Sequence, residues 1–152
     1  MVNISKKGID TFIVKMPFNI AFFKIGAIKS IMKDYKYENW YIGGHSLGGV
    51  VATMDAKKSD VKGLILLASY ATTKVNCKVL SIYGSNDGVL NIDEYKKNKK
   101  NIINYTEMLI EGGNHANFGN YGNQKGDKES TISRQEQQDI TALEIFKFVS
   151  AN

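Results

Sequence analysis

The sequence predicts an α/β domain with a mainly parallel β-sheet. Short apolar runs alternate with stretches of helical periodicity along the 152 residues, which is typical of strands joined by helical crossovers. The run Gly63–Ser69 (GLILLAS) is apolar at almost every position, as expected for a strand covered by helices on both faces. A chain of this length fits one domain, so we expect a single domain over residues 1–152.

The amino-terminal part of the chain is expected to form two strands and two helices. Thr11–Lys15 (TFIVK) has the composition of a strand, and Pro17 ends it because proline has no N–H to donate. Apolar residues at helical spacing predict a helix over Ile20–Tyr35. A second strand, Trp40–Gly43, precedes a helix over Gly48–Lys58, whose terminal lysines suit the negative end of the helix dipole.

The same alternation continues to the carboxyl end. Lys78–Tyr83 and Tyr105–Ile110 are predicted strands, and Asp93–Lys100 is a predicted short polar helix between them. The segment Ser133–Glu136 (SRQE) has the capping-box pattern, which predicts that a last helix begins there and continues to Phe148. Together with the earlier runs, these segments indicate a sheet of about five strands flanked by helices.

The charge pattern argues against a nucleic-acid-binding protein. The net charge is +5, but Arg134 is the only arginine among the 20 basic residues. Base reading and bidentate phosphate contacts favour arginine. The densest lysine cluster, within residues 96–100, fits the solvated face of a helix, and a polyanion-binding site is the alternative interpretation.

The single cysteine and the hydropathy pattern indicate the cellular compartment in which the protein is expected. Cys77 has no second cysteine to pair with, so we expect no intramolecular disulfide and no cysteine metal site. Lone thiols are typical of reducing compartments. No segment has the pattern of a signal peptide or the length of an apolar membrane span. We therefore expect a cytoplasmic protein.

A glycine-rich turn directly after the strand at residues 40–43 has the pattern G-x-S-x-G. It consists of Gly44, His45, Ser46, Leu47 and Gly48. This is the spacing of a nucleophile elbow, a sharp strand-to-helix turn that exposes the serine hydroxyl. We expect that Gly44 and Gly48 must lack side chains to avoid backbone clashes. The N–H of Leu47 is expected to stabilise an oxyanion. A glycine-rich turn with a structural serine is the alternative.

A serine nucleophile needs a base and an orienting acid, and candidates for both follow predicted strands. His115 lies just past the strand at residues 105–110, and Asp87 lies directly after the strand at residues 78–83. Because the carboxyl ends of parallel strands meet at one edge of a sheet, both are expected near Ser46. The chain order Ser46, Asp87, His115 is that of α/β-hydrolases.

The other candidate side chains are expected to have different roles. His45 is expected to make packing or hydrogen-bond contacts, because neighbouring residues in an elbow diverge. Asp55 and Asp60 fall in or after a helix and are poorer candidates for the acid. A surface position for His115 and pure turn chemistry for Asp87 are the competing interpretations.

Five segments resemble the bacterial α/β-hydrolase family 5 type: YIGGHSLGG, GLILLASY, VLSIYGSNDGVLN, IEGGNHANFGNYG and TISRQEQQ. The resemblance covers essentially all of the chain. It implies a serine-hydrolase fold with Ser46 as nucleophile, Asp87 as acid and His115 as base. It also implies that the segment GNYGNQKGD, residues 119–127, is a loop near the site.

The chain departs from this family at its amino end. Family members carry further strands and a glycine-containing loop before the part that matches FIVKMPFNIAFF, and that loop donates the second oxyanion N–H. We therefore expect the usual first strands and half of the oxyanion hole to be lacking, and the strand at residues 11–15 to pair with the nucleophile strand. The N–H groups of Phe18 and Asn19 are candidate substitutes. An exposed strand edge is expected to permit homo-oligomers.

The leading hypothesis is a serine hydrolase that cleaves small acyl esters through an acyl-enzyme, with no cofactor and no metal. Its partner is then a small-molecule ester, without nucleic acid or a membrane span. The alternative is a shortened, catalytically weak relative that acts as a scaffold or binding protein.

Overall fold

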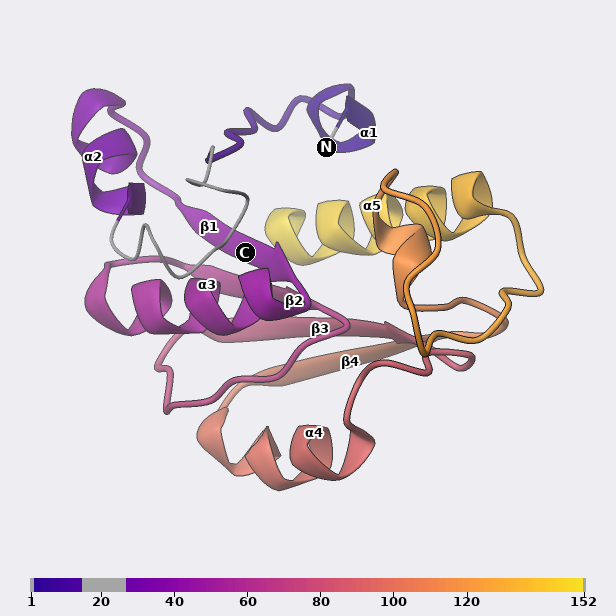
Figure 1. The fold of residues 1–152 in the computed structure, drawn as a ribbon. Helices are drawn as coiled ribbons and strands as arrows, with labels where there is room; N and C mark the ends of the chain where they lie inside the picture. Colours follow the sequence, from indigo (N-terminus) through magenta and orange to yellow (C-terminus); the bar gives the residue numbers. More distant parts are fainter. Residues whose placement is uncertain (1, 15–26, 152) are drawn as a thin grey trace.

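Four parallel strands form the sheet that carries the candidate site (Figure 1). The computed structural model describes residues 2–14 and 27–151. Within them the strands are β1 (Tyr41–His45), β2 (Gly63–Leu67), β3 (Lys78–Gly84) and β4 (Tyr105–Ile110). Their order in the sheet is β1-β2-β3-β4, and all three neighbouring pairs are parallel. The predicted α/β class with a parallel sheet is therefore confirmed.

Helices cover both faces of this sheet (Figure 1). The described helices are α1 (Val2–Ser5), α2 (Ala27–Asp34), α3 (Leu47–Lys58), α4 (Ile92–Asn98) and α5 (Arg134–Ser150), with the 3₁₀ turns η3 (Lys99–Asn101) and η4 (Ala116–Phe118). Helices α2 and α3 pack on one face, and α5 packs on the other. The alternation of strands and helices seen in the sequence thus produces three layers.

The core is divided by the alternation of side chains along β2. Leu64 and Leu66 have no exposed surface and pack against α3 on one face. Ile65, between them, packs on the other face with Ile145 and Phe148 of α5. A strand buried on both faces needs apolar residues at consecutive positions, which explains the unbroken apolar run of this segment.

Both ends of α5 are anchored. Ser133 caps the amino end, where its hydroxyl oxygen accepts a hydrogen bond from the Glu136 N–H at 3.1 Å. At the other end the Lys78 Nζ donates to the carbonyl oxygens of Phe148 and Ala151, at 2.9 and 2.8 Å. A cation there also opposes the negative end of the helix dipole. The predicted cap is confirmed, and the helix is fixed relative to β3.

Among the described residues the sheet has four strands, whereas the sequence predicted about five. Residues 11–14 form no strand, although TFIVK has strand-like composition, and Lys15 lies outside the described residues. Phe12 instead places its ring against Tyr35 and Trp40, with ring centroids 4.6 and 5.6 Å apart. The segment is therefore held by aromatic packing, and among the described residues β1 pairs only with β2.

The predicted helix over Ile20–Tyr35 is seen in part. Its described portion is α2, which ends at Asp34, and residues 20–26 lie outside the described part of the chain. No helix in the described ranges combines the length and apolar character that crossing a membrane requires.

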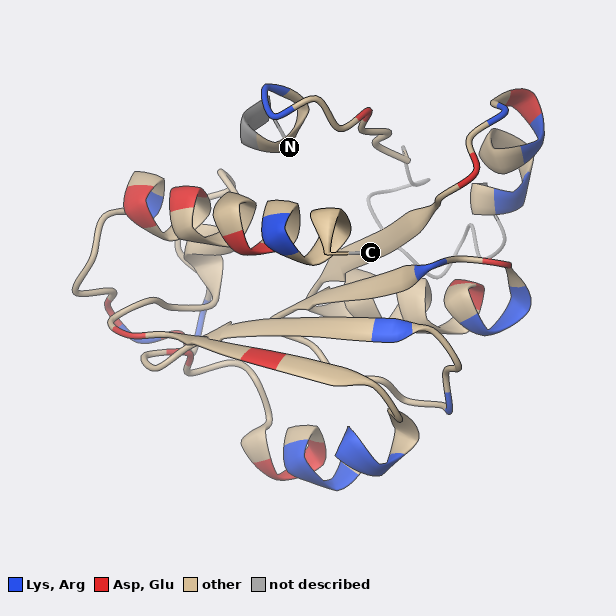
Figure 2. Ribbon diagram, turned by 180° about the vertical axis from the view of Figure 1, so that it is seen from behind, with Lys and Arg blue, Asp and Glu red and all other residues tan. Residues whose placement is uncertain are grey.

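The lysine cluster lies on α4 and η3, where the ribbon at the bottom of Figure 2 is largely blue. Lys97 pairs with Glu94 at 3.1 Å, one turn away. Lys99 pairs with Glu107 of β4, and its ammonium lies 5.4 Å from the ring centroid of Tyr105. Two of these cations are therefore matched by neighbouring carboxylates.

Removal of the α5 cap should be measurable in unfolding. Ser133→Ala removes the acceptor for the Glu136 N–H and is expected to lower the free energy of unfolding by about 1 kcal/mol. Urea unfolding followed by circular dichroism measures this difference. Ser150→Ala, an exposed serine in the last turn of the same helix, is the control and should change little. Equal stabilities of the two variants would contradict the assignment of the cap.

Candidate active site

The three predicted site residues follow three different strands at one edge of the sheet. Parallel pairing aligns His45, the last residue of β1, with Leu67 of β2, and aligns the ends of β3 and β4 at Gly84 and Ile110. Ser46 follows β1 directly, whereas Asp87 and His115 lie in the loops after β3 and β4. The topology therefore brings side chains that are far apart in sequence to a common edge.

Ser46 occupies a strained backbone conformation. Its φ of 52° and ψ of −124° are unfavourable for a residue with a side chain, and such a conformation costs about 1–3 kcal/mol. Two main-chain hydrogen bonds hold it: its N–H donates to the Leu67 carbonyl at 2.9 Å, and its carbonyl accepts from the Gly49 N–H at 3.0 Å. Strand β1 ends and helix α3 begins on either side of this residue. This is the geometry of a nucleophile elbow.

The glycines of this turn differ in their importance. A Cβ at Gly44 would lie 2.3 Å from the carbonyl carbon and oxygen of Gly48, so Gly44 must lack a side chain as expected. The corresponding expectation for Gly48 is wrong, because a Cβ there would meet nothing within 4 Å. The second tight position is Gly49, where a Cβ would lie 2.5 Å from the Cβ and Oγ of Ser69. The close contact therefore comes from the loop after β2.

Asp87 and His115 form a buried pair. The distances from His115 Nδ1 to Asp87 Oδ2 and Oδ1 are 2.9 and 3.1 Å, and the two side chains are only 1% and 2% exposed. Asp87 Oδ1 also accepts hydrogen bonds from the N–H groups of Val89 and Leu90, at 2.9 and 2.7 Å. The structure thus brings two of the three predicted residues into direct contact.

The hydrogen bonds determine the charge of Asp87 and the tautomer of His115. Burial raises the pKa of the Asp87 carboxyl, but hydrogen bonds from His115 and from the Leu90 and Val89 amides outweigh it, and the pKa lies below its ordinary value. An ionised carboxylate can only accept, so Nδ1 carries the proton in this pair. In the neutral imidazole Nε2 is then an acceptor.

The His115 Nε2 atom is buried and has no hydrogen-bond partner in the structure. The Ser46 hydroxyl is therefore not hydrogen-bonded to it, and the structure leaves the third contact of the predicted set unmade. Hydrogen bonds between catalytic groups are often long without substrate and shorten in the reacting complex. The unpartnered nitrogen is a free acceptor in a water-poor setting.

His45 makes the packing and hydrogen-bond contacts expected of it. The Tyr121 hydroxyl lies 2.7 Å from His45 Nδ1, and the ring centroid of Phe118 lies 5.6 Å from that of His45. The His45 ring also lies against the His115 ring, with centroids 4.6 Å apart. Burial lowers the pKa of His45 to about 4. His45 is therefore neutral and supports one side of the His115 imidazole.

Comparison with known proteins shows the family of the chain. Residues 1–139 match the model of the alpha/beta hydrolase family. The chain belongs to the alpha/beta hydrolase family. No curated protein sequence is significantly similar to it.

Solved structures support the fold of this alpha/beta hydrolase family member. A predicted CIB-like hydrolase from Thermoplasma acidophilum is 20% identical, with a TM-score of 0.60, over 86% of this chain and 61% of its own. An alpha-beta serine hydrolase homologue from Coxiella burnetii is 16% identical, with a TM-score of 0.51, over 59% and 47%. Est1E from Butyrivibrio proteoclasticus, solved with ferulic acid, is 14% identical, with a TM-score of 0.62, over 88% and 70%. The chain spans less than two thirds of the first two proteins.

Of the predicted oxyanion donors, Leu47 lies within the part of the chain that the structure describes. Leu47 is the first residue of α3, where a backbone N–H has no acceptor within the helix. Phe18 and Asn19, the candidates for the second donor, lie outside the described residues. No group of three or more histidine, cysteine or acidic side chains is arranged to hold a metal ion in the described part of the chain.

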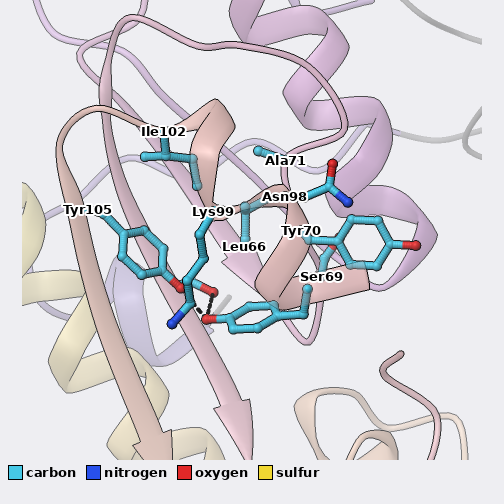
Figure 3. Close-up of a pocket in the computed structure, with 10 residues that line it drawn as sticks. Leu66, Ser69, Tyr70, Ala71, Asn98, Lys99, Ile102 and Tyr105 are labelled. Carbon is cyan, nitrogen blue, oxygen red and sulfur yellow. Dashed lines mark hydrogen bonds between the residues drawn. The ribbon is translucent and has the colours of Figure 1, made fainter. Parts of the chain in front are cut away.

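A small pocket lies elsewhere in the structure, between β2, β3 and α4 (Figure 3). Its volume is about 10 Å³, which is the space of one water molecule. Ser69, Tyr70, Lys99 and Tyr105 are among the residues that line it. Neither its size nor its lining makes it a substrate site, so the candidate site stays at the sheet edge that bears Ser46.

Asp127, which the sequence did not single out, also belongs to the site of this hydrolase family member. Its carboxylate accepts hydrogen bonds from the backbone N–H groups of His115 and Ala116, at 3.2 and 2.8 Å. It lies at the end of the segment GNYGNQKGD, which the family resemblance places near the site. That segment was the signal available in the sequence, but the contact joins residues 12 positions apart.

The unequal roles of the glycines predict unequal effects of alanine. Gly44→Ala is expected to lower the free energy of unfolding by about 1–3 kcal/mol or more, because the new methyl group meets backbone atoms. Gly48→Ala is expected to be neutral or to stabilise α3 by up to about 1 kcal/mol. Urea unfolding of both variants measures this. Equal destabilisation of the two would contradict the difference.

The lowered pKa of His45 predicts a pH-dependent stability. Unfolding returns this histidine to its ordinary value of 6.5 from about 4, so the folded form loses stability as the pH falls from about 6.5 to about 4. His45→Gln cannot take up a proton and should flatten this part of the profile. The measurement is the free energy of unfolding by urea at several pH values. Parallel profiles for the two proteins would contradict the prediction.

Proposed function

We propose that the chain is a serine hydrolase of the esterase type, with Ser46 as nucleophile, His115 as general base and Asp87 as the orienting acid. One observation carries the proposal. A buried carboxylate–imidazole pair, with its outer nitrogen unpartnered, lies in loops at the sheet edge that also bears a strained serine. Structural groups in cores are normally satisfied, and unsatisfied buried nitrogen atoms need a specific reason. An acceptor kept free for a proton is such a reason.

The reaction begins with attack of the Ser46 Oγ on the acyl carbonyl carbon of an ester. The proton of the hydroxyl moves to Nε2 of His115, and the ionised Asp87 stabilises the resulting imidazolium. The Leu47 N–H donates to the carbonyl oxygen as it becomes negative. The imidazolium then returns the proton to the departing alkoxide, which leaves the acyl group on Ser46.

Water then hydrolyses the acyl-enzyme, with His115 again acting first as base and then as acid. His115 removes a proton from a water molecule that attacks the acyl-enzyme, and the acid is released when Ser46 regains its proton. Small acyl esters are the proposed substrates, because Ser46 is only partly buried and the neighbouring Leu47 is 48% exposed. Two structural neighbours, an alpha-beta serine hydrolase homologue and Est1E with bound ferulic acid, support this reaction class.

Labelling with a fluorophosphonate probe tests the proposal. The wild-type protein is expected to react covalently at Ser46, and Ser46→Ala should lose the label entirely. Asp87→Asn is expected to react about 10⁴-fold more slowly, because the amide favours the wrong imidazole tautomer. Ser150→Ala, an exposed serine on α5, is the matched control and should label as the wild type does.

The outcome separates the two candidate functions. Loss of label in Ser46→Ala and His115→Ala, with hydrolysis of a short-chain nitrophenyl ester by the wild type, supports the esterase. A folded wild-type protein that neither labels nor hydrolyses the ester would overturn it and favour a catalytically weak relative that binds a partner.

A further inference from the structure

The carboxylate of Asp127 gathers four backbone N–H groups. Oδ1 accepts from Gly88 at 3.0 Å, from His115 at 3.2 Å and from Lys128 at 3.0 Å, and Oδ2 accepts from Ala116 at 2.8 Å. Gly88 belongs to the acid loop (residues 85–90), and His115 and Ala116 belong to the base loop (residues 111–118). One side chain therefore joins the two loops that carry the predicted acid and base.

Neighbouring contacts reinforce this junction. The Asn86 Nδ2 donates to the Glu129 carbonyl at 2.9 Å, and the Asn114 Nδ2 donates to the Lys128 carbonyl at 2.8 Å. A Cβ at Gly88 would lie 2.4 Å from the Gly126 carbonyl oxygen, so the acid loop lies directly against this segment. Residues 126–129, here called the clasp, thus contact both loops.

The chemistry of this position favours a carboxylate over an amide. An ionised carboxylate only accepts and does so at both oxygens, here from three N–H groups at Oδ1 and one at Oδ2. An asparagine has one acceptor oxygen, and its NH₂ group would face one of the donors. The two loops leave the sheet at Gly84 and Ile110, so their backbone N–H groups cannot be satisfied by strand pairing.

We propose that Asp127 is a positioning residue that fixes the acid loop relative to the base loop and so sets the Asp87–His115 hydrogen bond. Asp127 acts through the backbone on either side of the pair. It bonds the N–H of Gly88, next to Asp87, and the N–H of His115 itself. The catalytic consequence rests on the proposed serine-hydrolase function, whereas the effect on the Asp87–His115 pair does not.

The test is Asp127→Asn, with Asp60→Asn as the matched control. Asp60 is an exposed aspartate between α3 and β2, outside the junction. The first readout is the far-downfield proton resonance of the His115 Nδ1–H, assigned by its loss in His115→Ala. It is expected to be lost or shifted in Asp127→Asn and kept in Asp60→Asn. Far-ultraviolet circular dichroism confirms that each variant is folded.

The second readout is the rate of fluorophosphonate labelling. A misplaced base is expected to slow labelling of Asp127→Asn on the order of 10²-fold, with Asp60→Asn unchanged. A folded Asp127→Asn that keeps both the resonance and the labelling rate would overturn the proposal. If the wild-type protein does not label at all, the proposed function fails, and the resonance alone still decides the role of Asp127.

A measurement on the wild-type protein covers the case in which Asp127→Asn does not fold. The amides of Gly88, His115 and Ala116 are expected to exchange slowly with deuterium, because each donates a hydrogen bond to the Asp127 carboxylate. Fast exchange of these amides in the folded protein at neutral pH would contradict the junction.

Discussion

The parallel pairing of β1 to β4 is the constraint on which the candidate site depends. In-register parallel strands must all end at the same edge, and each must return through a connection on one face of the sheet. This pairing places Ser46 and the loops that carry Asp87 and His115 at one edge of the sheet, although the three residues are far apart in sequence. A change in register would remove the site even if every loop kept its own conformation.

The free-energy costs of the structure are concentrated at this edge. Ser46 has a strained backbone, and the Asp87–His115 pair is removed from water, with one nitrogen left unpartnered. Each feature is unfavourable by itself. The sheet below them is the opposite, with Leu64, Leu66 and Ile82 fully buried among apolar neighbours. Such a division between a satisfied core and a strained edge is typical of a functional site on a stable scaffold.

Local patterns allowed much of the fold to be predicted. The apolar run of β2, the G-x-S-x-G turn and the Ser133 cap are all encoded within a few consecutive residues, and the structure contains each of them. The errors arose where a distant segment decides. TFIVK has the composition of a strand, but the contacts of Phe12 with Tyr35 and Trp40 hold its described residues in another arrangement.

The prediction for the glycines of the turn failed for the same reason, because a neighbouring segment decides which glycine must lack a side chain. The tight position after the serine is Gly49, because Ser69 from the loop after β2 approaches it. The spacing rule alone assigned that role to Gly48. The five residues of the motif do not indicate where the neighbouring loop lies, so the close contact at Gly49 could not be predicted from the sequence.

Beyond the ends of the strands, side chains replace the sheet in setting positions. The Gln137 side chain of α5 is fully buried, accepts from the Asn114 N–H at 3.0 Å and donates to the Asn114 carbonyl at 2.7 Å. Asp127 likewise accepts hydrogen bonds from the N–H of the next residue, His115, and from the N–H of Gly88 in the acid loop. Lys78 holds α5 to β3. The base loop is therefore fixed to the sheet by two connections, one through β4, which it follows, and one through α5. Precise placement of an imidazole in a loop requires such side-chain hydrogen bonds, because a loop lacks the regular backbone hydrogen bonds of a sheet.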